Sequence, residues 1–162
     1  MSGLQRAGIV VGVDGSAAST AALTFALREG ALRDSPVEVV TAWAFEGPYD
    51  GQLTPDLIDQ ARSNAERAQD AAVTAALATV IAPPLLSRTV VEGAAGPELL
   101  RAADEAEYLV VGNGHKNIAQ RALLGSVSRY CVQHAPIPVL VVPVGAAADH
   151  RAPARAPASV AV

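Results

Sequence analysis

Two short glycine-containing segments carry the residue types that could bind an anion. One is Gly112-Asn-Gly114, and the other is Gly125-Ser126, which begins 13 residues after Gly112. Because glycine has no side chain, backbone N–H groups at such positions can approach a charged oxygen closely. A helix that starts at the second segment adds the partial positive charge of its first turn. The spacing therefore predicts that both segments contact one anion.

Each glycine segment is preceded or followed by an element that would hold it in place. The apolar run Tyr108–Val111 is typical of a buried strand. Gly112 and Gly114 tolerate positive φ, so we expect a sharp turn out of the strand at this point. After Gly125 the pattern predicts a helix that runs to about His134.

A similar strand, turn and helix lie near the start of the chain. Gly8–Val13 is a continuous apolar run rich in β-branched residues, which suits a central parallel strand. Asp14-Gly-Ser16 follows, and apolar residues at helical spacing occupy Ala22 to Leu27. Asp14 either forms the turn and caps this helix or contacts a ligand at the carboxyl end of the strand.

The rest of the chain repeats this alternation of strands and helices. Further strands are predicted at Val37–Ala42, Leu86–Glu92 and Val139–Val142. Further helices are predicted from 54 to 79, stopped by Pro83-Pro84, and from Gly96-Pro-Glu98 onward. The order predicts an α/β fold in which helices cover both faces of an open, five-stranded parallel sheet. The Gly- and Pro-rich loop Phe45–Gly51 either folds over a site as a lid or is a surface connection.

Composition limits the class of protein. The chain has 162 residues, 51% of them hydrophobic and 4% aromatic, so we expect one domain, 1–144, with a core of Ala, Val and Leu. Residues 145–162 are rich in Ala and Pro without periodicity and are expected to form a disordered tail. A formal charge of -4 argues against nucleic acid as a partner. We expect a cytoplasmic protein without membrane contact, because the N-terminus has no signal core and no apolar run reaches roughly 18 residues.

Side chains with catalytic potential are sparse. The single Cys131 excludes an intramolecular disulfide and is either a core thiol or a redox group. No nucleophile and base pair, carboxylate pair or histidine cluster with metal-ligand spacing is evident. The sequence therefore does not indicate an enzyme.

Several of these motifs together resemble the universal stress protein family. They are Gly112, Gly125 and Ser126, the run Ile-Val-Val-Gly-Val-Asp-Gly-Ser at 9–16, and His134-Ala-Pro-Ile-Pro-Val-Leu-Val-Val142. The resemblance covers roughly residues 7–143 and implies a Rossmann-like fold of the adenine nucleotide alpha hydrolase type, with strand order 3-2-1-4-5. It also implies a homodimer that pairs through the last strand.

In its nucleotide-binding branch, the family binds ATP beyond strands one and four. The resemblance implies that ATP, with or without Mg²⁺, or else cyclic AMP or AMP, binds here, and that hydrolysis of ATP is slow at most. The site residues implied are Gly12, Asp14, Ala42, Val111, Gly112, Gly114, His115, Gly125, Ser126 and Val127. The alternative is a dimeric interaction protein that binds no nucleotide.

His115 stands where the family pattern has its second glycine. If the backbone there must take positive φ or touch a phosphate, an imidazole costs on the order of 1–2 kcal/mol or blocks the ligand. If Gly114 takes the demanding conformation instead, His115 and Lys116 either face the phosphates or lie exposed in the loop.

Overall fold

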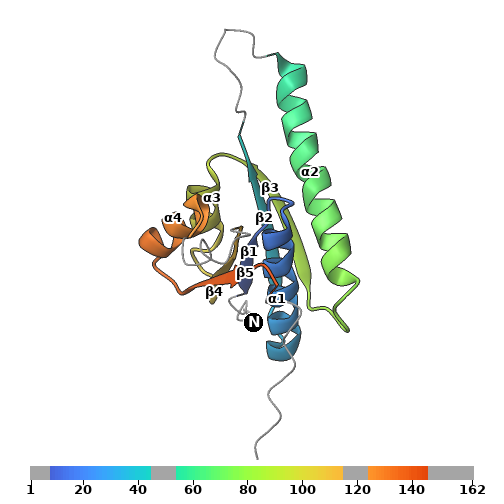
Figure 1. The fold of residues 1–162 in the computed structure, drawn as a ribbon, viewed down its shortest axis with the longest axis vertical. Coiled ribbons are helices and arrows are strands. Elements are labelled where there is room, and N and C mark those ends of the chain that lie inside the picture. The colour runs from blue at the N-terminus through green and yellow to red at the C-terminus, as the bar shows by residue number, and fades with distance from the viewer. Residues whose placement is uncertain (1–7, 45–53, 115–123, 146–162) are drawn as a thin grey trace, which may run out of the picture.

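The computed structural model describes residues 8–44, 54–114 and 124–145. These residues form one five-stranded parallel sheet with the strand order β3-β2-β1-β4-β5, flanked by four helices (Figure 1). The strands are β1 (Ile9–Gly12), β2 (Val37–Trp43), β3 (Leu86–Glu92), β4 (Tyr108–Asn113) and β5 (Val139–Pro143), and the helices are α1 (Ala17–Arg33), α2 (Pro55–Leu77), α3 (Ala95–Ala102) and α4 (Ser126–His134). The predicted fold class and strand order are confirmed. The Phe45–Gly51 loop, His115 and Lys116, and the tail from residue 146 lie outside the described residues.

Two apolar cores lie on opposite faces of the sheet. Figure 1 shows α1 and α2 on one side and α3 and α4 on the other. Successive side chains of β1 point to opposite faces of the sheet. Val11 packs with α1 and α2, whereas Val10 packs with α3 and α4. Cys131 is fully buried in the second core, and this burial raises the pKa of its thiol. The prediction of a core thiol is confirmed.

The order of the strands reverses at β1. Val11 lies beside Val39 of β2 on one side and beside Val110 of β4 on the other, in parallel register. The carboxyl ends of β1, β2 and β4 therefore meet at one edge of the sheet, where the connections to the next helices diverge. In open parallel sheets this is the place where a crevice for a ligand forms.

Two local predictions need correction. β4 does not turn at Gly112, because Gly112 pairs with Val142 and Asn113 pairs with Pro143 of β5. The described glycines with positive φ are Gly15, Gly93 and Gly145. Neither Gly112 nor Gly114 therefore takes the left-handed conformation that we expected at this turn.

The other correction concerns the end of α2. The helix ends at Leu77, before Pro83-Pro84 is reached. The hydroxyl of Thr79 donates to the carbonyl oxygen of Ala76 at 2.8 Å and satisfies one of the last carbonyl groups of the helix. The helix therefore ends two residues before the predicted Thr79, and Pro83-Pro84 lie beyond its last turn.

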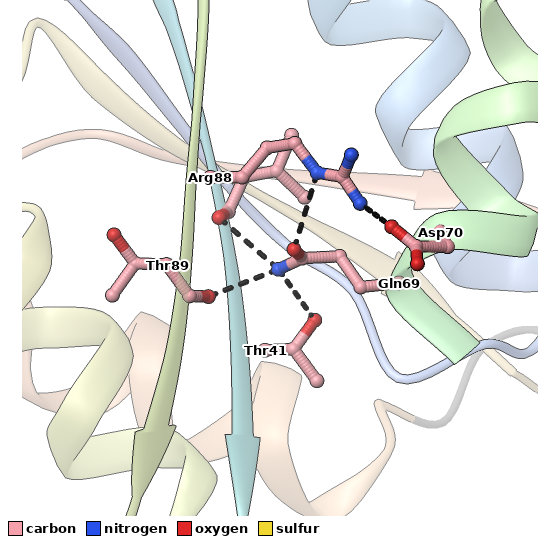
Figure 2. A network of polar contacts seen from close by, with 6 residues as sticks. Thr41, Gln69, Asp70, Arg88 and Thr89 are labelled. Atoms are coloured by element: carbon pink, nitrogen blue, oxygen red, sulfur yellow. Dashed lines mark hydrogen bonds and ion pairs between the residues drawn. The ribbon is translucent and has the colours of Figure 1, made fainter. Parts of the chain in front are cut away.

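The buried side-chain amide of Gln69 links α2 to β2 and β3. Gln69 is 2% exposed, and its Nε2 donates to Thr41 Oγ1 at 3.0 Å and to the carbonyl oxygen of Thr89 at 2.9 Å (Figure 2). Its Oε1 accepts a hydrogen bond from Arg88 Nε at 3.4 Å, and the same guanidinium pairs with Asp70. This network links α2, β2 and β3, with Gln69 and Thr41 buried and with Arg88 and Asp70 at its solvent-exposed end.

Removal of this amide is expected to destabilise the fold. In Gln69→Leu the hydroxyl of Thr41 and the guanidinium of Arg88 lose a partner, which costs about 2 kcal/mol of unfolding free energy. Urea denaturation measures the loss. Gln60→Leu is the matched control, since Gln60 lies exposed on the same helix, and it should change stability by less than about 0.5 kcal/mol. Equal effects of the two substitutions would contradict the role of the network.

Among the described residues, no helix combines the length and the apolar character that crossing a lipid bilayer requires.

Candidate functional site

A pocket of about 270 Å³ opens at the carboxyl ends of β1, β2 and β4. It is bounded by the start of α1 on one side and by the starts of α3 and α4 on the other. The predicted site residues that line it are Gly12, Asp14, Ala42, Val111, Gly112, Gly114, Gly125, Ser126 and Val127. The structure therefore brings together every predicted site residue that it describes.

Residue 112 must be a glycine because the backbone of α1 lies close to it. A Cβ at Gly112 would lie 2.5 Å from the carbonyl carbon and oxygen of Ala18 and 2.8 Å from the amide nitrogen of Ser19. These backbone atoms belong to the first turn of α1, so they cannot move aside as a flexible side chain can. Helix α1 thus packs directly on β4, and the other side of Gly112 remains open to the pocket.

Gly114 is under no such constraint. No heavy atom of the described residues lies within 4 Å of the Cβ that a side chain would add there. Its φ also lies outside the left-handed region. The hypothesis that Gly114 takes a demanding conformation in place of His115 is therefore wrong, and the role of His115 itself stays a prediction.

The start of α4 presents unused backbone donors to the pocket. Gly125 is the N-cap, with φ -61° and ψ 166°, and no side chain of the described residues caps the helix. The first bond within the helix runs from the amide of Arg129 to the carbonyl oxygen of Gly125. The amides of Ser126 and Val127 therefore have no partner within the helix, and their residues line the pocket. Such amides, together with the helix dipole, favour a bound anion.

The start of α1 differs, because a side chain caps it. Ser16 is the N-cap, and its Oγ accepts the amide N–H of Ser19 at 3.1 Å. Asp14 Oδ1 accepts the amide N–H of Ser16 at 2.9 Å, and Ser19 Oγ accepts the amide N–H of Asp14 at 3.3 Å. Of the two alternatives for Asp14, the structure shows the turn former, whereas the cap is Ser16. Asp14 nevertheless lines the pocket, so contact with a ligand stays open to it.

These hydrogen bonds also set the charge of the pocket. Burial raises the pKa of Asp14, but hydrogen bonds from Ser16 and Ser19 outweigh it, and the pKa lies below the ordinary value of 3.8. Asp14 is therefore a carboxylate at neutral pH. Because it is ionised and partly exposed, it can accept hydrogen bonds from hydroxyl groups of a ligand.

Acid titration is expected to expose this lowered pKa. Folding favours ionised Asp14, so its contribution to stability is fully present above about pH 4 and is lost as pH falls through the lower native pKa. Asp14→Asn removes the charge but keeps an oxygen that can accept the Ser16 N–H. We expect the variant to have the lower urea midpoint at neutral pH and the difference to shrink under acid conditions. A difference that stays constant down to about pH 3 would contradict this assignment.

The opposite half of the pocket is apolar. Val40 and Ala42 of β2 face Ala95 and Leu99 of α3 across it. A Cβ at Gly12 would lie 2.7 Å from Leu99 Cδ1, so the glycine makes room for this leucine. The resulting slot suits the flat, weakly polar face of an aromatic base.

The sequence did not predict the residues of α3 or the serines that complete the lining. These are Val13, Ser16, Ala18, Ser19, Val40, Ala95, Leu99 and Ser128. Ser16 and Ser19 follow Asp14 closely, and that proximity was an available signal. Ser128 likewise follows the predicted Ser126 and Val127 in α4. Nothing in the local sequence places Leu99 here, since it comes from α3, which carries no predicted site residue. Among the described residues, no three His, Cys, Asp or Glu side chains lie close enough together to hold a metal ion.

Comparison with known proteins adds to this geometry. Residues 7–143 match the sequence pattern of the Universal stress protein family. The chain belongs to this family. It is 33% identical over 149 residues to a universal stress protein of Mycolicibacterium smegmatis, a match that covers 83% of this chain and 47% of that protein. This universal stress protein therefore spans about half the length of that relative.

Solved universal stress proteins share its fold. UspA from Lactobacillus plantarum superposes with a TM-score of 0.71 at 24% identity, and the match covers 86% of this chain and 99% of that one. A universal stress protein solved in complex with cAMP superposes with a TM-score of 0.55 at 29% identity, covering 85% and 97% of the two chains.

Proposed function

We propose that this universal stress protein binds ATP or a related adenine nucleotide in the pocket beyond β1 and β4 and acts in a cytoplasmic stress response. The observation that carries this proposal is the combination of three chemistries in one pocket. Its lining includes the apolar residues Ala42 and Leu99, the carboxylate of Asp14 and, at the start of α4, the amides of Ser126 and Val127. The base, ribose and phosphate of a nucleotide require these three environments.

Each part of the nucleotide has a candidate partner. The slot would take adenine, with the main chain of β2 at Ala42 beside its edge. Ionised Asp14 would accept hydrogen bonds from ribose hydroxyls. Gly112 and the first turn of α4 would surround the first phosphate with N–H groups. The pocket volume of about 270 Å³ lies near the lower end for ligand sites, about 300 Å³, so further phosphates of ATP would extend out of it.

A relative supports the choice of ligand. The universal stress protein solved with cAMP is 29% identical to this chain and covers 85% of it. An adenine nucleotide is therefore compatible with this fold at that level of similarity. We infer that binding changes the conformation or the partners of the protein.

Calorimetric titration of nucleotide-stripped protein tests the proposal. We expect saturable binding of ATP with Mg²⁺ at micromolar concentrations. The titration is repeated with AMP and cAMP, and GTP is expected to bind more weakly. Absence of heat for all of them at millimolar concentration would refute nucleotide binding. The protein would then be a dimeric interaction protein, the alternative that the sequence left open.

We also propose that β5 pairs with a second copy of the chain. It is an edge strand in which Val139, Leu140 and Val141 stay half exposed, and an apolar edge of this kind is otherwise an aggregation hazard. The carbonyl oxygen of Pro138 accepts the amide of Leu109, so Val141, three residues along, directs its own N–H away from β4.

A proline at Val141 tests this interface. Val141→Pro removes a donor from the free edge and leaves the bonds to β4 in place. Light scattering is expected to show a dimer for the wild type and a monomer for the variant. A monomeric wild type at micromolar concentration would contradict the proposal.

A further inference from the structure

The two backbones proposed to hold the phosphate belong to elements that the described chain does not connect directly. Gly112 lies in β4, whereas Gly125 begins α4, and residues 115–123 between them are outside the described part. A direct contact between β4 and α4 would fix the distance between them. Among the described residues, Ser128 in the first turn of α4 makes a polar contact with β4.

Ser128 makes a direct polar link between α4 and β4. Its Oγ donates to the carbonyl oxygen of Gly112 at 3.0 Å, and the residue is only 3% exposed. The acceptor belongs to the same residue whose Cα packs on the backbone of Ala18 and Ser19 in α1. Because that contact leaves no room for Gly112 to shift, the hydroxyl of Ser128 fixes α4 to an immobile point of the sheet.

Packing on the far side of α4 cannot replace this link. The ring of Tyr130 lies against Gly96 of α3, where a Cβ would be 2.4 Å from Tyr130 Cδ1. Cys131 is buried in the core between the helices and the sheet. These contacts hold the helix against α3 and the sheet, but apolar contacts are non-directional and allow small movements along the helix axis. A hydrogen bond restricts such movement through its distance and its angle.

The geometry points to Ser128 as a positioning residue for phosphate. Its bond to Gly112 holds the amides of Ser126 and Val127 where both backbones can reach the same phosphate group. This role rests on the proposed nucleotide binding and deepens it, because it separates recognition of the phosphate from recognition of the base. The base slot at Ala42 and Leu99 lies on β2 and α3, and α3 keeps its packing on Tyr130 of α4 when the serine hydroxyl is removed, so binding of adenosine should be nearly insensitive to the substitution.

The test compares ligands with and without phosphate. For Ser128→Ala we expect roughly tenfold weaker binding of AMP, as for the loss of well-placed hydrogen bonds. Binding of adenosine should stay within about twofold of the wild type. Ser128→Thr keeps the hydroxyl and should restore most of the affinity for AMP. Equal weakening for AMP and adenosine, or no rescue by threonine, would overturn the inference.

Ser35→Ala is the matched control. Ser35 is also 3% exposed, and its Oγ donates one hydrogen bond, to Glu107 at 3.1 Å, at the opposite end of the sheet. Both variants lose one buried hydroxyl and should lose similar stability. Only Ser128→Ala should change the ratio of AMP to adenosine affinity, and a similar change in Ser35→Ala would show that the effect reflects general destabilisation.

Hydrogen exchange separates this inference from the proposed function. In the free protein the amide of Arg129, which donates to the carbonyl oxygen of Gly125 at 2.9 Å, should exchange several-fold faster in Ser128→Ala than in the wild type, because the start of α4 is released from β4. Unchanged exchange would overturn the positioning role whether or not nucleotides bind. If the wild type binds neither AMP nor adenosine while exchange accelerates as expected, the proposed function fails and the link from α4 to β4 stands.

Discussion

Gly125→Val is expected to weaken ATP binding roughly 100-fold, which corresponds to about 2.8 kcal/mol. Gly125 lines the pocket at the start of α4. Among the described residues, the nearest atom to an added Cβ is Ser128 Oγ at 3.8 Å, so a side chain fits without disturbing the fold. The branched side chain of valine would then occupy the space in which the phosphate approaches the amides of Ser126 and Val127. Calorimetric titration of wild type and variant measures the difference.

Two further substitutions separate obstruction from loss of the glycine cap. Gly125→Ala removes the same cap residue but adds only one methyl group, so it should weaken ATP binding much less than valine does. Ala94→Val places valine at the N-cap of the neighbouring helix α3, at an exposed residue that does not line the pocket. It should leave the affinity unchanged. If Gly125→Val binds ATP as tightly as the wild type, the phosphate does not lie at this helix.

Gly112→Ala is expected to cost about 3 kcal/mol of unfolding free energy, at the upper end for an overpacked core. The new methyl group would meet backbone atoms of Ala18 at 2.5 Å. β4 lies between β1 and β5, so relief requires α1 to move away from the sheet. A domain of this size is typically stable by roughly 5–15 kcal/mol, so the loss is large but leaves a folded protein to measure.

Gly114→Ala is the control for that substitution, two residues along the same segment. Its added methyl group meets no described atom within 4 Å, and its φ does not favour glycine. We expect the unfolding free energy of Gly114→Ala to stay within about 0.5 kcal/mol of the wild type. Thermal or urea unfolding of Gly112→Ala and Gly114→Ala measures the difference in stability. Similar stability of the two variants would mean that α1 does not require a glycine at residue 112.

Much of the fold followed from local patterns. The continuous apolar run Gly8–Val13 predicted a strand within a residue or two of its bounds, because a strand buried on both faces leaves no polar position. An error arose where a neighbouring strand decided the conformation. The extension of β4 past Gly112 depends on pairing with β5.

The candidate site, too, could be predicted only in part from the sequence. Glycines and a serine at matching spacing, together with Asp14 after the first strand, were sufficient to predict the residues that line one side of the pocket. The physical reason for each glycine was not readable from the chain. Gly112 is needed for the backbone of α1 and Gly12 for the side chain of Leu99, and both neighbours are remote in sequence.

The sequence by itself determined the alternation of strands and helices and the residue types available to an anion, since both depend on short-range periodicity and on the absence of side chains. Only the tertiary structure decided which of the two helix starts carries a side-chain cap. The hydroxyl of Ser16 accepts the amide N–H of Ser19 at the start of α1, whereas α4 has no side-chain cap among the described residues. The tertiary structure also determined the position of α4. Ser128 Oγ donates to the carbonyl oxygen of Gly112 at 3.0 Å, and only folding brings these two residues together.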